Sequence, residues 1–113
     1  MDSERPIDEK SKSQIEERLA SMGDYVKMSY LQRALKSGLS LDTRKFVLFR
    51  LAGIYEARRM YNQAARMVKS AAEINTTFKE KIKDYIRSVE LYIKAGNHMS
   101  VKSVAMFLGT QAT

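Results

Sequence analysis

One stretch of the chain, residues 46–74, constrains the fold more than any other. It reads FVLFRLAGIYEARRMYNQAARMVKSAAEI. Its first half is apolar on almost every face of a helix, which indicates that neighbours lie on more than one side. Its second half carries small or slim residues at helical spacing, which let another helix approach closely: Ala64, Ala65, Val68, Ala71 and Ala72. The stretch therefore predicts two antiparallel helices joined by the short, charged segment from Arg58 to Tyr61.

The remaining sequence shows the same helical pattern, and no segment has the alternating period of a strand. Capping residues and glycines divide the chain into six helices, expected at about residues 11–22, 24–37, 42–58, 61–74, 78–95 and 98–109. Ser11 with Gln14, Ser13 with Glu16, and Thr77 with Glu80 have the spacing of capping boxes. We therefore predict an all-α chain with a flexible arm over residues 1–7, one helical domain over 8–109 and a tail over 110–113.

The six predicted helices form three hairpins whose turns resemble one another. The turns read Gly23-Asp24-Tyr25, Arg59-Met60-Tyr61 and Gly96-Asn97-His98, so that a ring recurs after 36 and then 37 residues. Repeats of this length are typical of helical solenoids, in which each hairpin buries its faces against the next.

The middle hairpin resembles a tetratricopeptide repeat. Its first helix matches that family at Leu51, Ala52 and Tyr55, and its second at Tyr61, Ala64, Val68 and Ala71. The third hairpin matches at Tyr92, Gly96 and Ala105, and the first at its turn. The repeats are longer than the 34 residues of that family, as in the related repeats of SNAP-type vesicle-fusion adaptors. The resemblance implies an α-solenoid of three stacked antiparallel hairpins, and a scaffold or adaptor that binds other proteins.

The resemblance also implies a concave groove lined by the first helix of each hairpin. It places these residues on the groove: Phe46, Phe49, Gly53, Lys83, Ile86 and Glu90. At 100° per residue, the helix over 78–95 carries an apolar stripe flanked by a basic ridge that includes Lys79, Lys83 and Arg87, and Arg50 is equivalent to Arg87 one repeat earlier. Such a surface suits an acidic amphipathic peptide. The alternative is that the basic side chains merely cover apolar edges. The candidate peptide-binding residues are Phe46, Phe49, Arg50, Lys83, Ile86, Arg87 and Glu90.

The charge of the chain is uneven. The formal net charge is +7, and residues 43–113 carry thirteen Lys and Arg against five Asp and Glu. This excess favours an anionic partner, which we expect to be an acidic protein or peptide. A helical nucleic-acid-binding protein is the alternative. Against it, the predicted turns lack a recognition helix rich in Arg, Asn and Gln at base-reading spacing.

The sequence offers little for catalysis, and we expect no enzyme, cofactor or metal. There is no cysteine, and the one histidine, His98, stands at the aromatic position of the third turn, where a packing role is expected. No glycine-rich phosphate loop precedes a helix. No apolar run approaches the ~20 residues that span a bilayer, and the polar N-terminus is unlike a signal peptide. We therefore expect a cytoplasmic protein.

The last predicted helix carries apolar residues on several sides. Val104 and Leu108 share one side, and Met106 and Phe107 cannot both point at the helix over 78–95 together with them, because they lie on other sides of the turn. Open apolar surface of this kind usually marks an interface. We therefore predict that Val104, Met106, Phe107 and Leu108 mediate homodimerisation or dock a partner.

Overall fold

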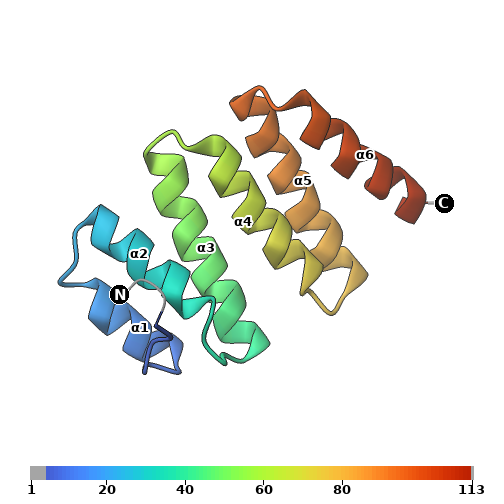
Figure 1. The fold of residues 1–113 in the computed structure, drawn as a ribbon. Coiled ribbons are helices and arrows are strands. Elements are labelled where there is room, and N and C mark those ends of the chain that lie inside the picture. The colour runs from blue at the N-terminus through green and yellow to red at the C-terminus, as the bar shows by residue number, and fades with distance from the viewer. Residues whose placement is uncertain (1–4, 113) are drawn as a thin grey trace.

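The computed structural model describes residues 5–112, with side chains up to residue 109. It contains six helices: α1 (Lys12–Leu19), α2 (Asp24–Ala34), α3 (Leu41–Ala57), α4 (Tyr61–Glu73), α5 (Phe78–Ala95) and α6 (His98–Ala112). They follow one another across an elongated domain of 43 × 28 × 22 Å (Figure 1). No strand occurs between residues 5 and 112, so the prediction of an all-α chain with six helices is confirmed.

The capping residues explain where several helices begin. The Ser11 hydroxyl accepts the Gln14 N–H while the Gln14 side chain accepts the Ser11 N–H, which forms the expected capping box. The Thr77 hydroxyl accepts the Glu80 N–H at 3.3 Å and begins α5. Asn97 accepts the Ser100 N–H at 3.1 Å and begins α6. These bonds satisfy backbone donors that have no partner inside the helix.

Three helix ends differ from the prediction. α1 stops at Leu19, and Gly23 precedes α2 as an extended N-cap instead of closing α1. α2 stops at Ala34 because the next residues form tighter i→i−3 bonds, in which the Ser37 N–H donates to the Ala34 carbonyl. α6 continues through Gly109 to Ala112, so most of the predicted tail is helical; a single glycine costs a helix only about 1 kcal/mol.

The end of the predicted N-terminal arm is held against α2. Ile7 is buried, and its N–H donates to the Ser37 hydroxyl at 2.8 Å. The Tyr30 hydroxyl donates to the Glu9 carboxylate; burial, followed by this bond, raises the pKa of Tyr30 well above its ordinary value. Ile7 is therefore packed in the fold, which corrects the prediction of a flexible arm at that residue, while residues 1–4 of the predicted arm and residue 113 of the predicted tail lie outside the described part.

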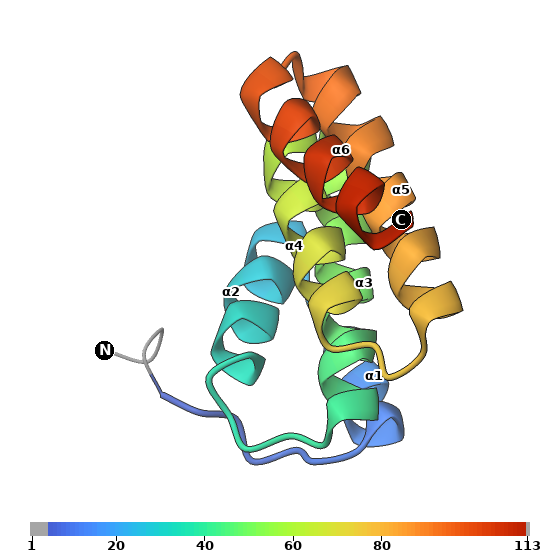
Figure 2. The same cartoon turned by 90° about the vertical axis from the view of Figure 1, so that its right-hand side faces the viewer.

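The core is centred on α4, which crosses the middle of the molecule in Figure 2. Its five small or slim residues are all buried: Ala64, Ala65, Val68, Ala71 and Ala72. α4 packs against α3 on one side and, more extensively, against α5 on the other. The small side chains therefore admit two neighbours, whereas the sequence predicted close approach to only one.

The turns between α3 and α4 and between α5 and α6 share one backbone geometry. The Met60 N–H donates to the Tyr55 carbonyl at 2.8 Å, and the Asn97 N–H donates to the Tyr92 carbonyl at 3.0 Å. The residues before these donors, Arg59 and Gly96, both have left-handed backbones, with φ of 60° and 71°. The two turns thus repeat with a shift of 37 residues. The α1–α2 turn differs, because Gly23 has a φ of −79°.

Candidate functional site

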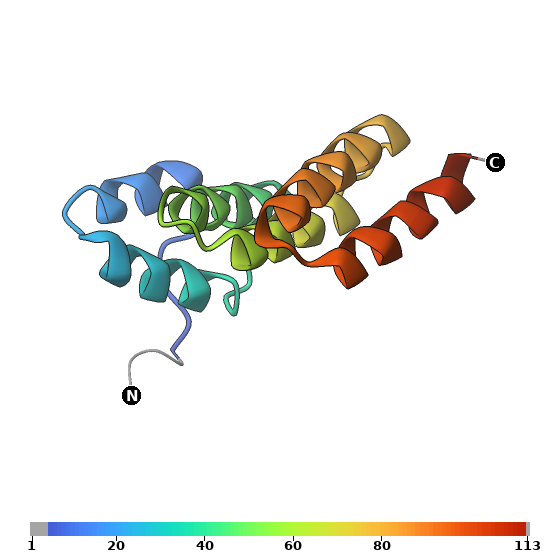
Figure 3. The same ribbon diagram turned by 90° about the horizontal axis from the view of Figure 1, so that it is seen from above.

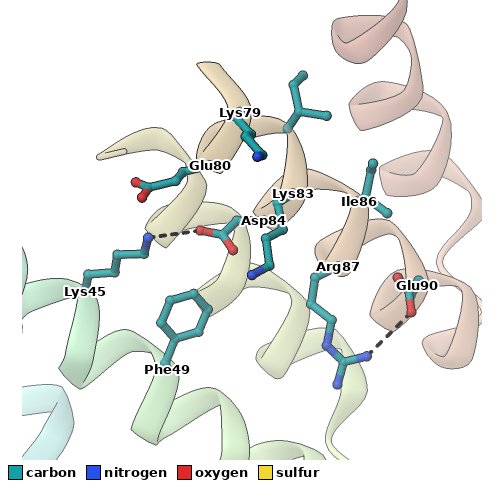
Figure 4. A pocket seen from close by; sticks show the side chains of 10 residues that line it. Lys45, Phe49, Lys79, Glu80, Lys83, Asp84, Ile86, Arg87 and Glu90 are labelled. Carbon is teal, nitrogen blue, oxygen red and sulfur yellow. Dashed lines mark ion pairs between the residues drawn. The ribbon is translucent and has the colours of Figure 1, made fainter. Parts of the chain in front are cut away.

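An open groove of about 750 Å³ lies between α3 and α5. α3 contributes Lys45 and Phe49, and α5 contributes the rest of the lining: Lys79, Glu80, Ile82, Lys83, Asp84, Ile86, Arg87 and Glu90. A groove remains between α3 and α5 because both helices pack on α4 and contact each other through their side chains (Figure 4). Two large apolar side chains remain partly open to solvent, Phe49 at 38% and Ile86 at 48%. The groove therefore offers apolar surface beside charged groups.

Two of the cations in the groove hold the protein together. The Arg87 guanidinium lies 2.6 Å from the Glu56 carboxylate of α3 and 3.7 Å from that of Glu90. The Lys45 amine lies 3.4 Å from the Asp84 carboxylate of α5. Figure 4 marks the pairs Lys45–Asp84 and Arg87–Glu90. Arg87 and Lys45 therefore connect α3 to α5 and are already partly neutralised.

Lys79 and Lys83 are different. Both are exposed, and neither makes an ion pair or a side-chain hydrogen bond with any residue between positions 5 and 109. They are four residues apart, so both lie on the same side of α5. Figure 4 shows the Lys83 side chain extending toward Phe49. Their two amines are therefore the groups in the groove that are available to bind an external anion.

A buried polar cluster fixes one end of the groove. Asn75, in the connection between α4 and α5, donates from its side-chain amide to the Asp84 carboxylate at 2.7 Å. Lys45 contacts both of these side chains. Asp84 and Asn75 are buried, so the ion pair and hydrogen bonds compensate for the loss of water. The cluster joins α3, the α4–α5 connection and α5 and thereby sets the width of the groove.

The structure brings together five of the seven predicted peptide-binding residues. Phe49, Lys83, Ile86, Arg87 and Glu90 line the groove. Phe46 is half-buried outside the lining, and the Arg50 guanidinium lies 2.5 Å from the Glu16 carboxylate of α1. Arg50 was expected beside Arg87. Instead, each arginine reaches a carboxylate on the preceding odd-numbered helix.

The sequence analysis missed the roles of Lys45, Glu80 and Asp84. It placed Lys79 in the basic ridge and Ile82 in the apolar stripe of α5 without assigning either residue to the groove. Helical spacing contained a signal for Lys45, because it lies one turn before Phe49 on the same side of α3. No such signal marks Asp84, which reads as a surface residue in a charged segment. Its burial depends on the position of Lys45 and Asn75, which lie far from it in the sequence.

The predicted interface residues of α6 divide into three groups. Val104 is buried and Leu108 is partly buried against the core. The Phe107 ring packs against the Tyr85 ring of α5 at a centroid distance of 4.7 Å. Burial, with a smaller effect of Glu73, raises the pKa of Tyr85. Met106 is 67% exposed, so it is the predicted interface residue most open to solvent.

Three further features of the chain bear on other functional classes: its one histidine, possible metal-binding groups and possible membrane-spanning helices. His98 is exposed as the first residue of α6, so the expected packing role of its ring is wrong. Within the part of the chain that the structure describes, no group of three or more His, Cys, Asp or Glu side chains could hold a metal ion. No helix among the described residues combines the length and the apolar character needed to cross a bilayer.

Comparison of the chain with models of known protein families, with curated proteins and with solved structures finds no match. The functional argument therefore rests on the geometry of the groove and of the helix pairs.

Proposed function

We propose that this chain is a non-catalytic protein-interaction module that binds an acidic segment of a partner protein in the groove between α3 and α5. One observation carries the proposal: Lys79 and Lys83, which lack ion-pair partners among residues 5–109, stand beside the partly exposed Phe49 and Ile86. Carboxylates of the bound segment pair with the two amines, and its apolar side chains cover the two apolar residues.

The proposed architecture is a solenoid of stacked antiparallel hairpins, similar to that of tetratricopeptide proteins. Its support is the 37-residue shift that relates the α3–α4 turn to the α5–α6 turn, including their left-handed residues Arg59 and Gly96. In such an arrangement alternate helices form one side of the molecule. α3 and α5 are alternate helices, and the groove lies between them.

Nucleic-acid binding is the competing function, and the ion pairs of the groove weigh against it. Arg50, Arg87 and Lys45 face carboxylates of this chain, which leaves fewer cations for a row of phosphates. A titration with single-stranded RNA and double-stranded DNA over a range of salt concentrations separates the functions. The peptide proposal expects weak binding with no preference for sequence; tight binding that Lys79→Glu with Lys83→Glu abolishes would favour a nucleic-acid partner instead.

Selection from a library of random displayed peptides tests the proposal directly. The library is selected on the wild type, after removal of peptides that bind the variant with Lys79→Glu and Lys83→Glu. We expect enriched peptides to combine Asp or Glu with large apolar residues at regular spacing. Enrichment without an excess of acidic residues, or failure of the selection on the wild type, would contradict the proposed function.

We also propose that the exposed side of α6 mediates self-association. Met99 and Met106 are strongly exposed and lie on the same side of α6, whereas the buried Val104 lies on a different side. Light scattering at high protein concentration is expected to detect a dimer that Met106→Glu dissociates. Met106 is a better position to test than Phe107, because a charge at Phe107 would also disturb Tyr85. A wild type that stays monomeric at all concentrations would eliminate this proposal.

A further inference from the structure

The helix α5 packs on the α3–α4 pair, and the surface that it covers is a seat for a helix. α5 packs on the small residues of α4, and two charged residues of α3 fasten it. Lys45 pairs with Asp84 at 3.4 Å, and Glu56 pairs with Arg87 at 2.6 Å. The seat therefore consists of a surface of small side chains on the second helix and two anchoring positions on the first.

The α5–α6 pair contains the same seat, shifted by 37 residues. The anchoring positions Lys45 and Glu56 correspond to Ile82 and Ile93 of α5, and Ile93 is 60% exposed. The small-residue positions Val68 and Ala72 of α4 correspond to Ala105 and Gly109 of α6. Ala105 is exposed, and a Cβ atom added at Gly109 would meet nothing within 4 Å.

No helix of the described chain covers this second seat. Figure 3 shows α5 and α6 side by side at the end of the molecule opposite α1 and α2, with α6 outermost. The chemistry of the seat also differs from that of the first, because isoleucines stand where α3 has a lysine and a glutamate. A helix that occupies it would be anchored by apolar contacts at both positions and not by ion pairs.

We infer that the seat between α5 and α6 binds an amphipathic helix of a partner protein, with an apolar stripe and acidic flanks. Two lysines select the acidic flanks: Lys79 on α5, and Lys102 on α6 at the position that corresponds to Ala65 of the first seat. Both are exposed and have no ion-pair partner between residues 5 and 109. A second copy of this chain fits this seat less well, because it would bring Lys79 and Lys102 of both molecules close together.

This site overlaps the groove between α3 and α5 at Lys79 and Ile82, which line that groove. Ile93, Ala105 and Gly109 lie outside the groove lining, and Phe49 and Lys83 are not part of the helix seat. The two sites are therefore tested through residues that only one of them contains. A variant that damages one and spares the other distinguishes them.

The experiment uses a defined probe, a stapled, fluorescein-labelled helical peptide of about 18 residues, long enough to span the length of α5. It has leucines at positions that alternate three and four residues apart, glutamates on both flanks and alanines elsewhere. Fluorescence anisotropy measures its affinity for the whole chain. We expect Ile93→Glu with Ala105→Glu to weaken binding by about tenfold or more, since both charges would lie against the leucine stripe.

Two comparisons make the result specific. Val26→Glu with Ser29→Glu adds the same negative charge at exposed positions of α2 and is expected to change the affinity by less than about twofold. A peptide with glutamines in place of the flanking glutamates is expected to bind about threefold or more weakly. Circular dichroism checks that each variant keeps its helix content.

The inference is overturned if the probe fails to bind the wild type, or if the two double variants bind it equally well. It is also overturned if Lys83→Glu alone abolishes binding, since the probe would then occupy the groove. Light scattering tests whether a second copy of the chain occupies the seat. A wild-type dimer that Ile93→Glu dissociates would assign the seat to that second copy.

Discussion

The α3–α4 and α5–α6 pairs share one turn geometry, shifted by 37 residues, yet their second helices lie in different surroundings. In the first pair, Ala65, Val68 and Ala72 are buried, because α5 covers them. In the second, the equivalent Lys102, Ala105 and Gly109 are exposed. The comparison teaches that the burial of a helix in this chain depends on whether a following helix covers it. The sequence adapts to that difference at the anchoring positions, which are charged on α3 and apolar on α5.

The same substitution on α4 and on α6 should give the largest difference between the pairs. Ala64 is fully buried on α4, so Ala64→Leu should overpack the core and lower the free energy of unfolding by about 1–3 kcal/mol. Ala105 is exposed on α6, so Ala105→Leu should change the free energy of unfolding by less than about 0.5 kcal/mol. Urea unfolding followed by circular dichroism measures both. Equal effects at the two positions would mean that α4 and α6 are not in different surroundings.

The two turns provide a smaller test, at their left-handed residues. Gly96 adopts a φ of 71° without strain, whereas Arg59 adopts 60° with a side chain in place. We expect Gly96→Ala to lower the free energy of unfolding by about 1 kcal/mol and Arg59→Gly to raise it by up to about 1 kcal/mol. The same urea titration checks both, and Gly38→Ala, at a position with a negative φ and open space around it, serves as the control. Destabilisation by Arg59→Gly would show that the turns are not equivalent.

Helix order and most helix starts could be predicted from the sequence, because the signals are local. Ser11 and Gln14, or Thr77 and Glu80, lie within one turn of each other, so spacing makes them candidates, although Ser13 and Glu16 have the same spacing. The structure forms the full capping box at Ser11 and Gln14 and only the Thr77 bond at the second pair. The N-terminal contact of Ile7 with Ser37 could not be predicted in this way, because it joins residues that are 30 positions apart. The helix ends at Leu19 and Ala34 were missed because the chain changes there to i→i−3 bonds, such as those from the Met22 N–H to Leu19 and from the Ser37 N–H to Ala34, before it reaches the glycine that was expected to end each helix.

The contacts of the charged groove residues could also be predicted only in part from the sequence. The sequence placed Lys79, Lys83 and Arg87 on one edge of α5, and periodicity was sufficient for that. It could not show that Arg87 faces Glu56 while the two lysines face solvent, because the partner lies on α3. That division depends on how far apart α3 and α5 lie and how they are rotated. Both quantities are set by packing on α4.

The difference between these two kinds of cation leads to the most direct test of the proposed function. A peptide from the selection on the wild type is labelled, and its dissociation constant is measured by fluorescence anisotropy. The test variant carries Lys79→Glu and Lys83→Glu. Its control carries Lys10→Glu and Lys36→Glu, which change the net charge equally at exposed positions outside the groove.

We predict that the groove variant weakens binding by about tenfold or more, because two charge-assisted contacts become repulsive, and that the control weakens it by less than about twofold through the screened long-range field. Raising the salt concentration should reduce the affinity of the wild type more than that of the groove variant. Equal losses in the two variants would contradict the account, since they would show that net charge, and not the groove between α3 and α5, attracts the acidic peptide.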